Sequence, residues 1–185
     1  MAVVGLMLGL MPAAEADSAQ AARTVPQHGI FVVGKTLGGV GLGYTQRQVT
    51  QRWGQSYTVC TSPQPLCSPT EPVWIFIAPS SGDEPMGAGV RLRNGKTTAV
   101  FTIGTPGVNS LSAGGLGGWK TSEGLHTFDP ISSINSLYPA ATIQTACILY
   151  GALSMRQGGV TSSFYTSSGT VYGFALSKPN EPICA

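Results

Sequence analysis

The sequence is poor in charge. Asp, Glu, Lys and Arg make up only 10% of its 185 residues, against about 25% in a typical soluble domain. Ten basic residues face eight acidic ones, so the formal net charge is +2. Binding to a nucleic-acid backbone needs a dense cationic surface, and we expect no nucleic-acid partner. Two histidines and eight acids are also few for a multi-ligand metal site, so we expect no metal and no cofactor.

Catalytic signatures are missing as well. No Gly-x-Ser-x-Gly nucleophile elbow occurs. The stretch Gly38–Gly43 fails the dinucleotide fingerprint, because Tyr44 stands where the last glycine is required. His126 and Asp129 are spaced for a base and its orienting acid, but Asp129 is expected to cap a helix instead. We therefore expect a protein that is not an enzyme, and a hydrolase is the weakest alternative.

The first residues are typical of a secretory leader. An apolar run, Ala2–Met11, ends at Pro12 and is followed by Ala14-Glu15-Ala16, the small-residue pattern that signal peptidase accepts. The run is too short for a bilayer, which needs about 20 apolar residues. We expect residues 1–16 to be a signal peptide, with cleavage after 21 as the alternative. The mature chain is then secreted or associated with the cell envelope, without a membrane span.

Four cysteines lie beyond this predicted leader, and an even count in an exported chain suggests two disulfides. Cys60 and Cys67 flank a proline-rich turn, so closing the loop between them costs little chain entropy. Cys147 and Cys184 would tie the end of the chain to an apolar strand. Among the three possible connectivities we predict Cys60–Cys67 and Cys147–Cys184.

Beyond the leader, one pattern occurs twice, at residues 30–103 and 119–184, on either side of a glycine-rich linker at 104–118. In each unit a short helix is followed by three strand-like runs, and a turn signal (Asn94-Gly95, Ser167-Ser168-Gly169) joins the last two. The predicted fold class is α+β, with two tandem helix-plus-three-strand units whose helices pack on one face of an antiparallel sheet. The predicted strands are Val73–Ala78, Gly89–Arg93, Thr97–Ile103, Thr145–Gly151, Thr161–Thr166 and Thr170–Leu176.

Both predicted helices carry an apolar pair at i and i+4 between recognisable ends. The first pair is Val49 and Trp53, with a cap at or near Thr45 and a stop at Gly54. The second pair is Ile134 and Tyr138, after an Asp129 cap and a proline at the first helical position.

The faces of the two hairpins follow from their turns. A three-residue loop in the second hairpin places one set on the helix-covered face (Phe164, Tyr172, Phe174, Leu176) and another on the opposite face (Tyr165, Val171, Ala175). The first hairpin has two possible registers. A two-residue turn exposes Arg91 and Arg93, whereas a three-residue loop pairs Val90 and Leu92 with Val100.

The string GKTLGGVGLGYT at residues 34–45, followed by Gln48-Val49 and Trp53-Gly54, resembles the G-x-x-L-G-x-V-x-L-G-M-T-x-x-x-V-x-x-x-x-G opening of small exported actinobacterial proteins. Those proteins are similar to the family of the beta-lactamase inhibitor protein (BLIP) and to the BamE-like superfold. The resemblance covers about residues 30–184. It implies two tandem units, each with a disulfide, and a concave sheet face that grips a partner protein. None of the inhibitor's binding residues can be placed on this chain.

Aromatic residues supply the candidate binding site. Trp74 and Phe76 alternate with aliphatic residues on the most apolar strand, so one set faces away from the helices unless the other repeat buries both faces. With Tyr165, and with Arg91 and Arg93 in one register, they would form a binding patch of the residue types that dominate interfaces. We expect a secreted, non-enzymatic module that binds another protein or an envelope component. The alternative is a structural module of the cell envelope.

Overall fold

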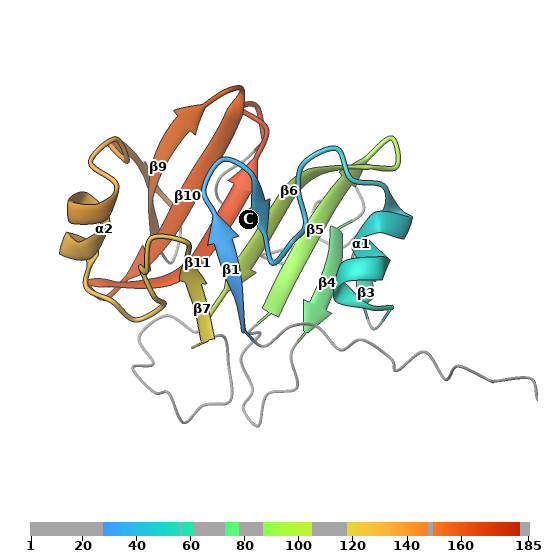
Figure 1. Cartoon of the computed structure of the whole chain (residues 1–185), viewed down its shortest axis with the longest axis horizontal. Coiled ribbons are helices and arrows are strands. Elements are labelled where there is room, and N and C mark those ends of the chain that lie inside the picture. Colours follow the sequence, from blue (N-terminus) through green and yellow to red (C-terminus); the bar gives the residue numbers. More distant parts are fainter. Residues whose placement is uncertain are drawn as a thin grey trace, which may run out of the picture.

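The computed structural model describes residues 28–55, 57–60, 73–77, 87–104, 118–147 and 150–181. These residues form an eight-stranded antiparallel sheet, a small three-stranded sheet and two short helices (Figure 1). The predicted signal peptide and most of the glycine-rich linker lie outside the described residues. In the described part of the chain, neither helix is long and apolar enough to cross a membrane.

The two halves of the chain meet at the centre of the large sheet. Its strand order is β3-β4-β5-β6-β11-β10-β9-β8, so each half contributes four strands and the two sets run outward from the β6·β11 pair. The first half supplies β3 (Thr58–Cys60), β4 (Val73–Ile77), β5 (Gly87–Arg93) and β6 (Lys96–Ile103). The second half supplies β8 (Ile143–Ala146), β9 (Gly151–Gln157), β10 (Val160–Ser167) and β11 (Thr170–Ser177).

The predicted fold class, two helix-plus-three-strand units, is therefore wrong: the chain is mostly β, and each half adds four strands to one continuous sheet. The predicted strand Thr145–Gly151 covers only the end of β8 and the first residue of β9. The sequence of β9, GALSMRQ, has no β-branched or aromatic residue and a low intrinsic strand propensity. It is a strand because β8 and β10 pair with it on both sides.

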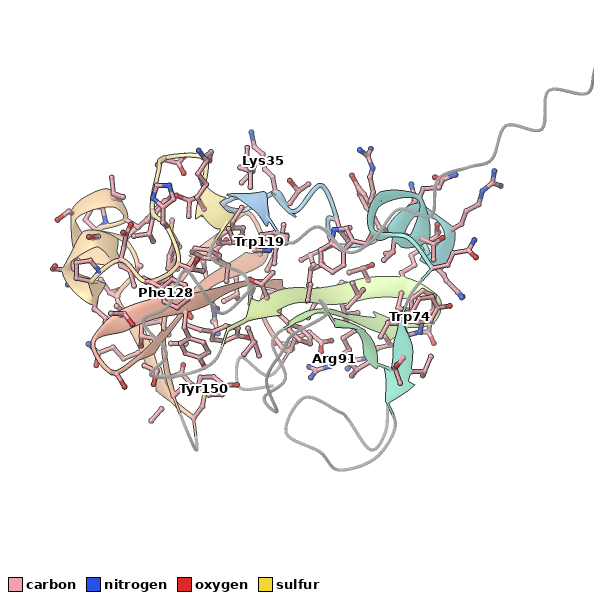
Figure 2. The ribbon with its side chains drawn as sticks, turned by 90° about the horizontal axis from the view of Figure 1, so that it is seen from below. Lys35, Trp74, Arg91, Trp119, Phe128 and Tyr150 are labelled. Carbon is pink, nitrogen blue, oxygen red and sulfur yellow. The ribbon has the colours of Figure 1, made fainter. Side chains whose placement is uncertain are left out.

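The small sheet lies on one side of the large one, together with the helices (Figures 1 and 2). It consists of β2 (Thr36–Leu37), β1 (His28–Val32) and β7 (Gly118–Thr121). Strands β1 and β7 pair in parallel, so the beginnings of the two halves lie side by side. On β7, Trp119 is fully buried and packs in the core, so it anchors the start of the second half.

The first helix, α1 (Gln46–Trp53), matches its prediction. Thr45 accepts a hydrogen bond from the Gln48 backbone N–H, and the Gln48 side chain accepts one from the Thr45 N–H, which completes a capping box. Val49 and Trp53 are fully buried. Gly54 ends the helix with a φ of 85°, in the range that favours glycine.

The second helix, α2 (Ile131–Leu137), begins differently from its prediction. Pro130 occupies the N-cap position, where no side chain caps the helix. The Asp129 carboxylate instead accepts a hydrogen bond from the backbone N–H of His126 at 2.7 Å. The predicted Asp129 cap is therefore wrong, because the side chain turns back to close the preceding turn. Ile134 and Tyr138 are buried, as the spacing predicts.

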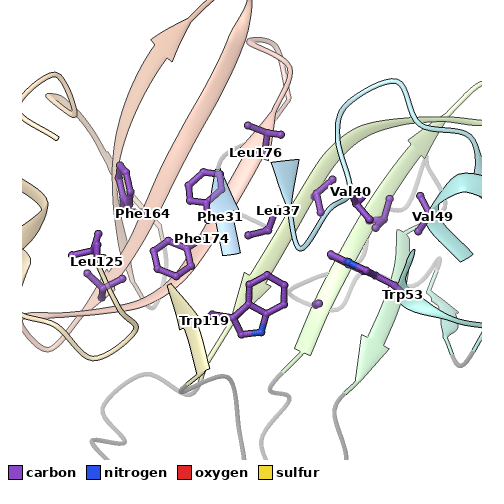
Figure 3. Close-up of a cluster of buried hydrophobic side chains, with 14 of the residues drawn as sticks. Phe31, Leu37, Val40, Val49, Trp53, Trp119, Leu125, Phe164, Phe174 and Leu176 are labelled. Carbon is purple, nitrogen blue, oxygen red and sulfur yellow. The ribbon is translucent and has the colours of Figure 1, made fainter. Parts of the chain in front are cut away.

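The core between the large sheet and the layer of helices and small sheet holds most of the buried aromatic and aliphatic side chains (Figure 3). The rings of Trp53 and Trp119 meet edge to face, 6.4 Å apart. Gly38 makes this contact possible, because a Cβ there would lie 2.6 Å from the Trp119 ring. We call the side of the large sheet that faces this core the helix face, and the opposite side the second face.

Bulges at equivalent places in the two hairpins decide which residues reach the second face. Both hairpins have two-residue turns, Asn94-Gly95 and Ser168-Gly169, with positive φ at all four residues. Next to each turn the pairing register shifts by one residue. The extra residue of the bulge is Thr98 on β6 in the first hairpin and Tyr172 on β11 in the second.

These bulges correct the predicted hairpin faces. In the first hairpin, Val90 pairs with Val100 although the turn has two residues. In the second hairpin, the predicted three-residue loop is wrong. Val171 packs in the helix-face core and Tyr172 on the second face, the reverse of the prediction.

Candidate functional site

The predicted binding residues do not form one patch. Trp74 belongs to the helix-face core and stacks on Tyr57, with ring centres 4.0 Å apart and planes within 7°. Tyr165 belongs to the cluster on the second face. The side chain of Phe76 lies outside the description. The predicted grouping of Trp74 with Tyr165 is wrong, because the two pack on opposite faces of the sheet.

Arg91 and Arg93 do take second-face positions at the end of β5. Figure 2 shows Arg91 on this side of the sheet. Both arginines contact the carboxylate of Glu181, at 3.1 Å for Arg91 and 3.3 Å for Arg93. The side chains of Arg91 and Glu181 are only 7% and 2% exposed, whereas that of Arg93 is 51% exposed. Glu181 follows the last strand, where the Lys178 N–H donates to the Thr98 carbonyl oxygen. The segment after β11 thus carries Glu181 to the second face, where it forms a buried ion pair with Arg91.

Three tyrosines form the aromatic centre of the second face. Tyr165 and Tyr172 lie 6.0 Å apart in a stacked arrangement, and Tyr150 meets both rings edge to face at 5.3 and 5.6 Å. Burial is the main reason why the pKa of Tyr165 and of Tyr172 lies far above the ordinary value, so both phenols stay protonated. Sequence reasoning missed Tyr150 and Tyr172. Only the bulge on β11 brings Tyr172 to this side.

A straight row of paired residues crosses the second face. It runs from Arg91 on β5 to Arg156 on β9 through three small side chains, Ala99, Ser177 and Thr161. Four strand spacings separate its two arginines, which is about 19 Å. Arg156 is exposed. The row therefore has cationic groups at both ends and three buried small residues between them.

Three buried polar atoms of the second face have no hydrogen-bond partner in the described structure: Arg91 Nε, Thr161 Oγ1 and Tyr172 Oη. Leaving a buried polar group unpaired costs about 1–3 kcal/mol. Because these atoms are buried, they are not accessible to a binding partner.

A separate hollow of about 470 Å³ lies on the outside of α1. Its lining comes from the exposed side of the helix and from the segment that leads into β3: Gln46, Arg47, Thr50, Gln55 and Tyr57. The Gln46 side-chain amide donates to the Tyr57 hydroxyl at 3.3 Å. None of these lining residues was singled out from the sequence, since a polar helix face is the ordinary appearance of a solvated helix.

The remaining sequence candidates have structural roles. His126 Nδ1 lies 3.7 Å from the Asp129 carboxylate, which already closes a turn by accepting from the His126 backbone. Among the described residues, no three His, Cys, Asp or Glu side chains gather as metal ligands would. Cys147 takes part in a disulfide. The pairings Cys60–Cys67 and Cys147–Cys184 remain predictions, because the other three cysteine side chains lie outside the description.

Comparison with known proteins gives little further information. No protein-family model matches the chain, and no curated protein does. A solved structure that matches is an extracellular protein containing an SCP domain from Bacillus anthracis strain Ames, with a TM-score of 0.46 and 8% identity. The match covers 92% of this chain and 50% of the other, so this chain spans about half of its length. At this level of similarity the match carries no functional conclusion, and the resemblance to the inhibitor family stays a prediction.

Proposed function

We propose that this chain is an exported, non-enzymatic protein-binding module that contacts its partner through the second face. The single observation that supports the proposal most is the make-up of that face. The side chains of Arg93 and Arg156 are exposed near its edges, above a buried layer of tyrosines and small residues. Arg is among the residue types that contribute most binding energy at protein interfaces.

The charges of the face indicate the kind of partner. In the described part of the second face, the acid Glu181 is engaged by Arg91 and Arg93. Arg156 is exposed and has no ion-pair partner among the described residues, so it favours a partner that presents a carboxylate. Such charges at the edge of an interface mainly raise the rate of association and select the partner.

The test is a quantitative pull-down from culture supernatant and cell-wall extract with the mature protein. The variant Arg93→Ala/Arg156→Ala removes the two exposed cations and keeps Arg91 and Glu181 in place, and Arg52→Ala removes an exposed cation from α1 as the matched control. We expect wild type and Arg52→Ala to recover the same protein in equal amounts and the double variant to recover at most about a tenth. Equal recovery by all three would refute the second face as the binding surface.

The alternative of a structural envelope module predicts another outcome. In that case the protein would sediment with the insoluble cell wall, and both arginine variants would do so to the same extent as wild type. A soluble partner that depends on Arg93 and Arg156 distinguishes the binding function from this scaffold function.

A further inference from the structure

Among the described strands, the large sheet ends at β3, next to the hollow on α1. Strand β3 is the first in the strand order, and it pairs with β4 alone among the described strands. Val59, in the middle of β3, is 48% exposed. An edge strand presents backbone N–H and C=O groups that can pair with another extended chain. The β3 edge is therefore a place where a peptide could add a strand.

The direction of such a peptide follows from the sheet. Every pairing in the eight-stranded sheet is antiparallel. A peptide that continued this pattern along β3 would end beside the beginning of β3. The hollow lies at that place, because Gln55 and Tyr57, which lead into β3, form part of its lining. The carboxyl end of the peptide would thus enter the hollow.

The chemistry of the hollow suits a carboxylate. Arg47 is its charged residue, its other lining residues are uncharged, and Arg47 has no ion-pair partner among the described residues. An arginine fork binds a carboxylate through two parallel hydrogen bonds. Tyr57 is held in place by its stack on Trp74 and by the Gln46 amide, so its ring offers a fixed wall for the last side chain of the peptide.

We propose that the α1 hollow and the β3 edge together form a second binding site, for the free C-terminal end of an extended peptide. The peptide pairs with β3 through its backbone, and its terminal carboxylate meets Arg47. This mode gives affinity through main-chain hydrogen bonds and specificity through the pocket at the end. The site is independent of the second face, so either one can fail without the other.

The experiment uses the full mature protein and two immobilised arrays of the same random eight-residue peptides, one ending in free carboxylates and one in amides. We expect binding to a subset of the carboxylate array and at least about tenfold weaker binding to the same peptides as amides, the size of effect expected for a charge-assisted hydrogen-bond pair. Arg47→Gln should lose the carboxylate preference. Arg52→Gln, on the same helix but outside the lining, should keep it.

A separate experiment tests the pairing of the peptide backbone with β3. The peptides that bind best are synthesised in two N-methylated series, one methylated at the odd and one at the even backbone positions. One of the two series should lose binding, because its methyl groups replace the N–H donors that pair with β3. Three results would overturn the proposal: no peptide binds either array, acids and amides bind equally, or Arg47→Gln behaves as Arg52→Gln does. If both N-methylated series still bound, the pairing with β3 would be refuted, and only the contact between Arg47 and the carboxylate would remain. Arg93→Ala/Arg156→Ala should bind the arrays as wild type does, which separates this test from that of the second face.

Discussion

Replacing Glu181 by Gln should lower the free energy of unfolding by about 3 kcal/mol, at the low end of the range for breaking a buried ion pair. The carboxylate is 2% exposed and lies 3.1 Å from the nearly buried guanidinium of Arg91. Gln keeps the volume but removes the charge, so Arg91 is left buried without a counter-ion. We choose the low end of the range because Glu181 follows the last strand, and local opening there would let water reach the guanidinium.

For a chain of this length, a loss of about 3 kcal/mol lowers Tm by roughly 6–12 °C. The loss of stability is measured by urea and thermal unfolding, with tryptophan fluorescence as the signal, since Trp53 and Trp119 are both fully buried. Arg93→Met is the matched control. Its side chain is 51% exposed and meets the same carboxylate, so its loss should cost less than about 1 kcal/mol.

The double variant Arg91→Met/Glu181→Gln should recover most of the lost stability, because an apolar side chain then replaces the uncompensated charge. Two results would refute this reasoning. One is a Glu181→Gln protein within about 1 kcal/mol of wild type, and the other is a double variant as unstable as the single one.

Two further predictions concern the packing and the acid sensitivity of the helix side. Gly38→Val should destabilise the fold by about 2–5 kcal/mol in urea unfolding, because its Cβ would lie 2.6 Å from the Trp119 ring at a residue with φ of 56°. Tyr138→Phe should raise the pKa of Glu123 toward its ordinary value in an NMR carboxyl titration, since the hydrogen bond from Tyr138 is the main cause of its lowered pKa. Above the unfolded-state pKa of Glu123, the ionised carboxylate stabilises the fold, and this contribution is lost as the pH falls through the lowered folded-state pKa. In the variant this pH-dependent contribution should be smaller.

Matched variants separate specific from general effects. Gly43→Val meets nothing within 4 Å at a residue with φ of 80°, so it should show only the backbone cost of about 1–2 kcal/mol. If it destabilised the protein as much as Gly38→Val, the argument from the Trp119 ring would fail. For Tyr138→Phe, an unchanged titration of Glu123 would show that the hydrogen bond does not lower its pKa.

The sequence predicts best where the information is local. The beginning and end of α1 follow from Thr45, Gln48 and Gly54, which lie within one or two turns of the helix that they bound. Its buried pair follows from the i, i+4 spacing of Val49 and Trp53. The same local reasoning failed at Asp129, where the carboxylate had a second local donor, the N–H of His126, in a turn that precedes the helix.

Strand number and strand order could not be predicted, because they depend on partners far away in the chain. Strand β9 has the composition of a loop or a helix and becomes a strand through pairing with β8 and β10. The parallel pairing of β1 with β7 joins segments separated by the whole first half of the chain. No local pattern in either segment indicates the other.

The composition of the second face was the hardest to predict, for a reason that the two hairpins make clear. Alternation along one strand tells which residues share a face, but the relation between two strands depends on their register, and a single extra residue reverses it. The bulge at Tyr172 moves this ring from the helix face to the second face, where it stacks on Tyr165. The row from Arg91 to Arg156 exists only after four such registers are known. A cationic residue at the end of a strand is uninformative by itself, and it becomes a site residue only when the sheet aligns it with the others across the same face.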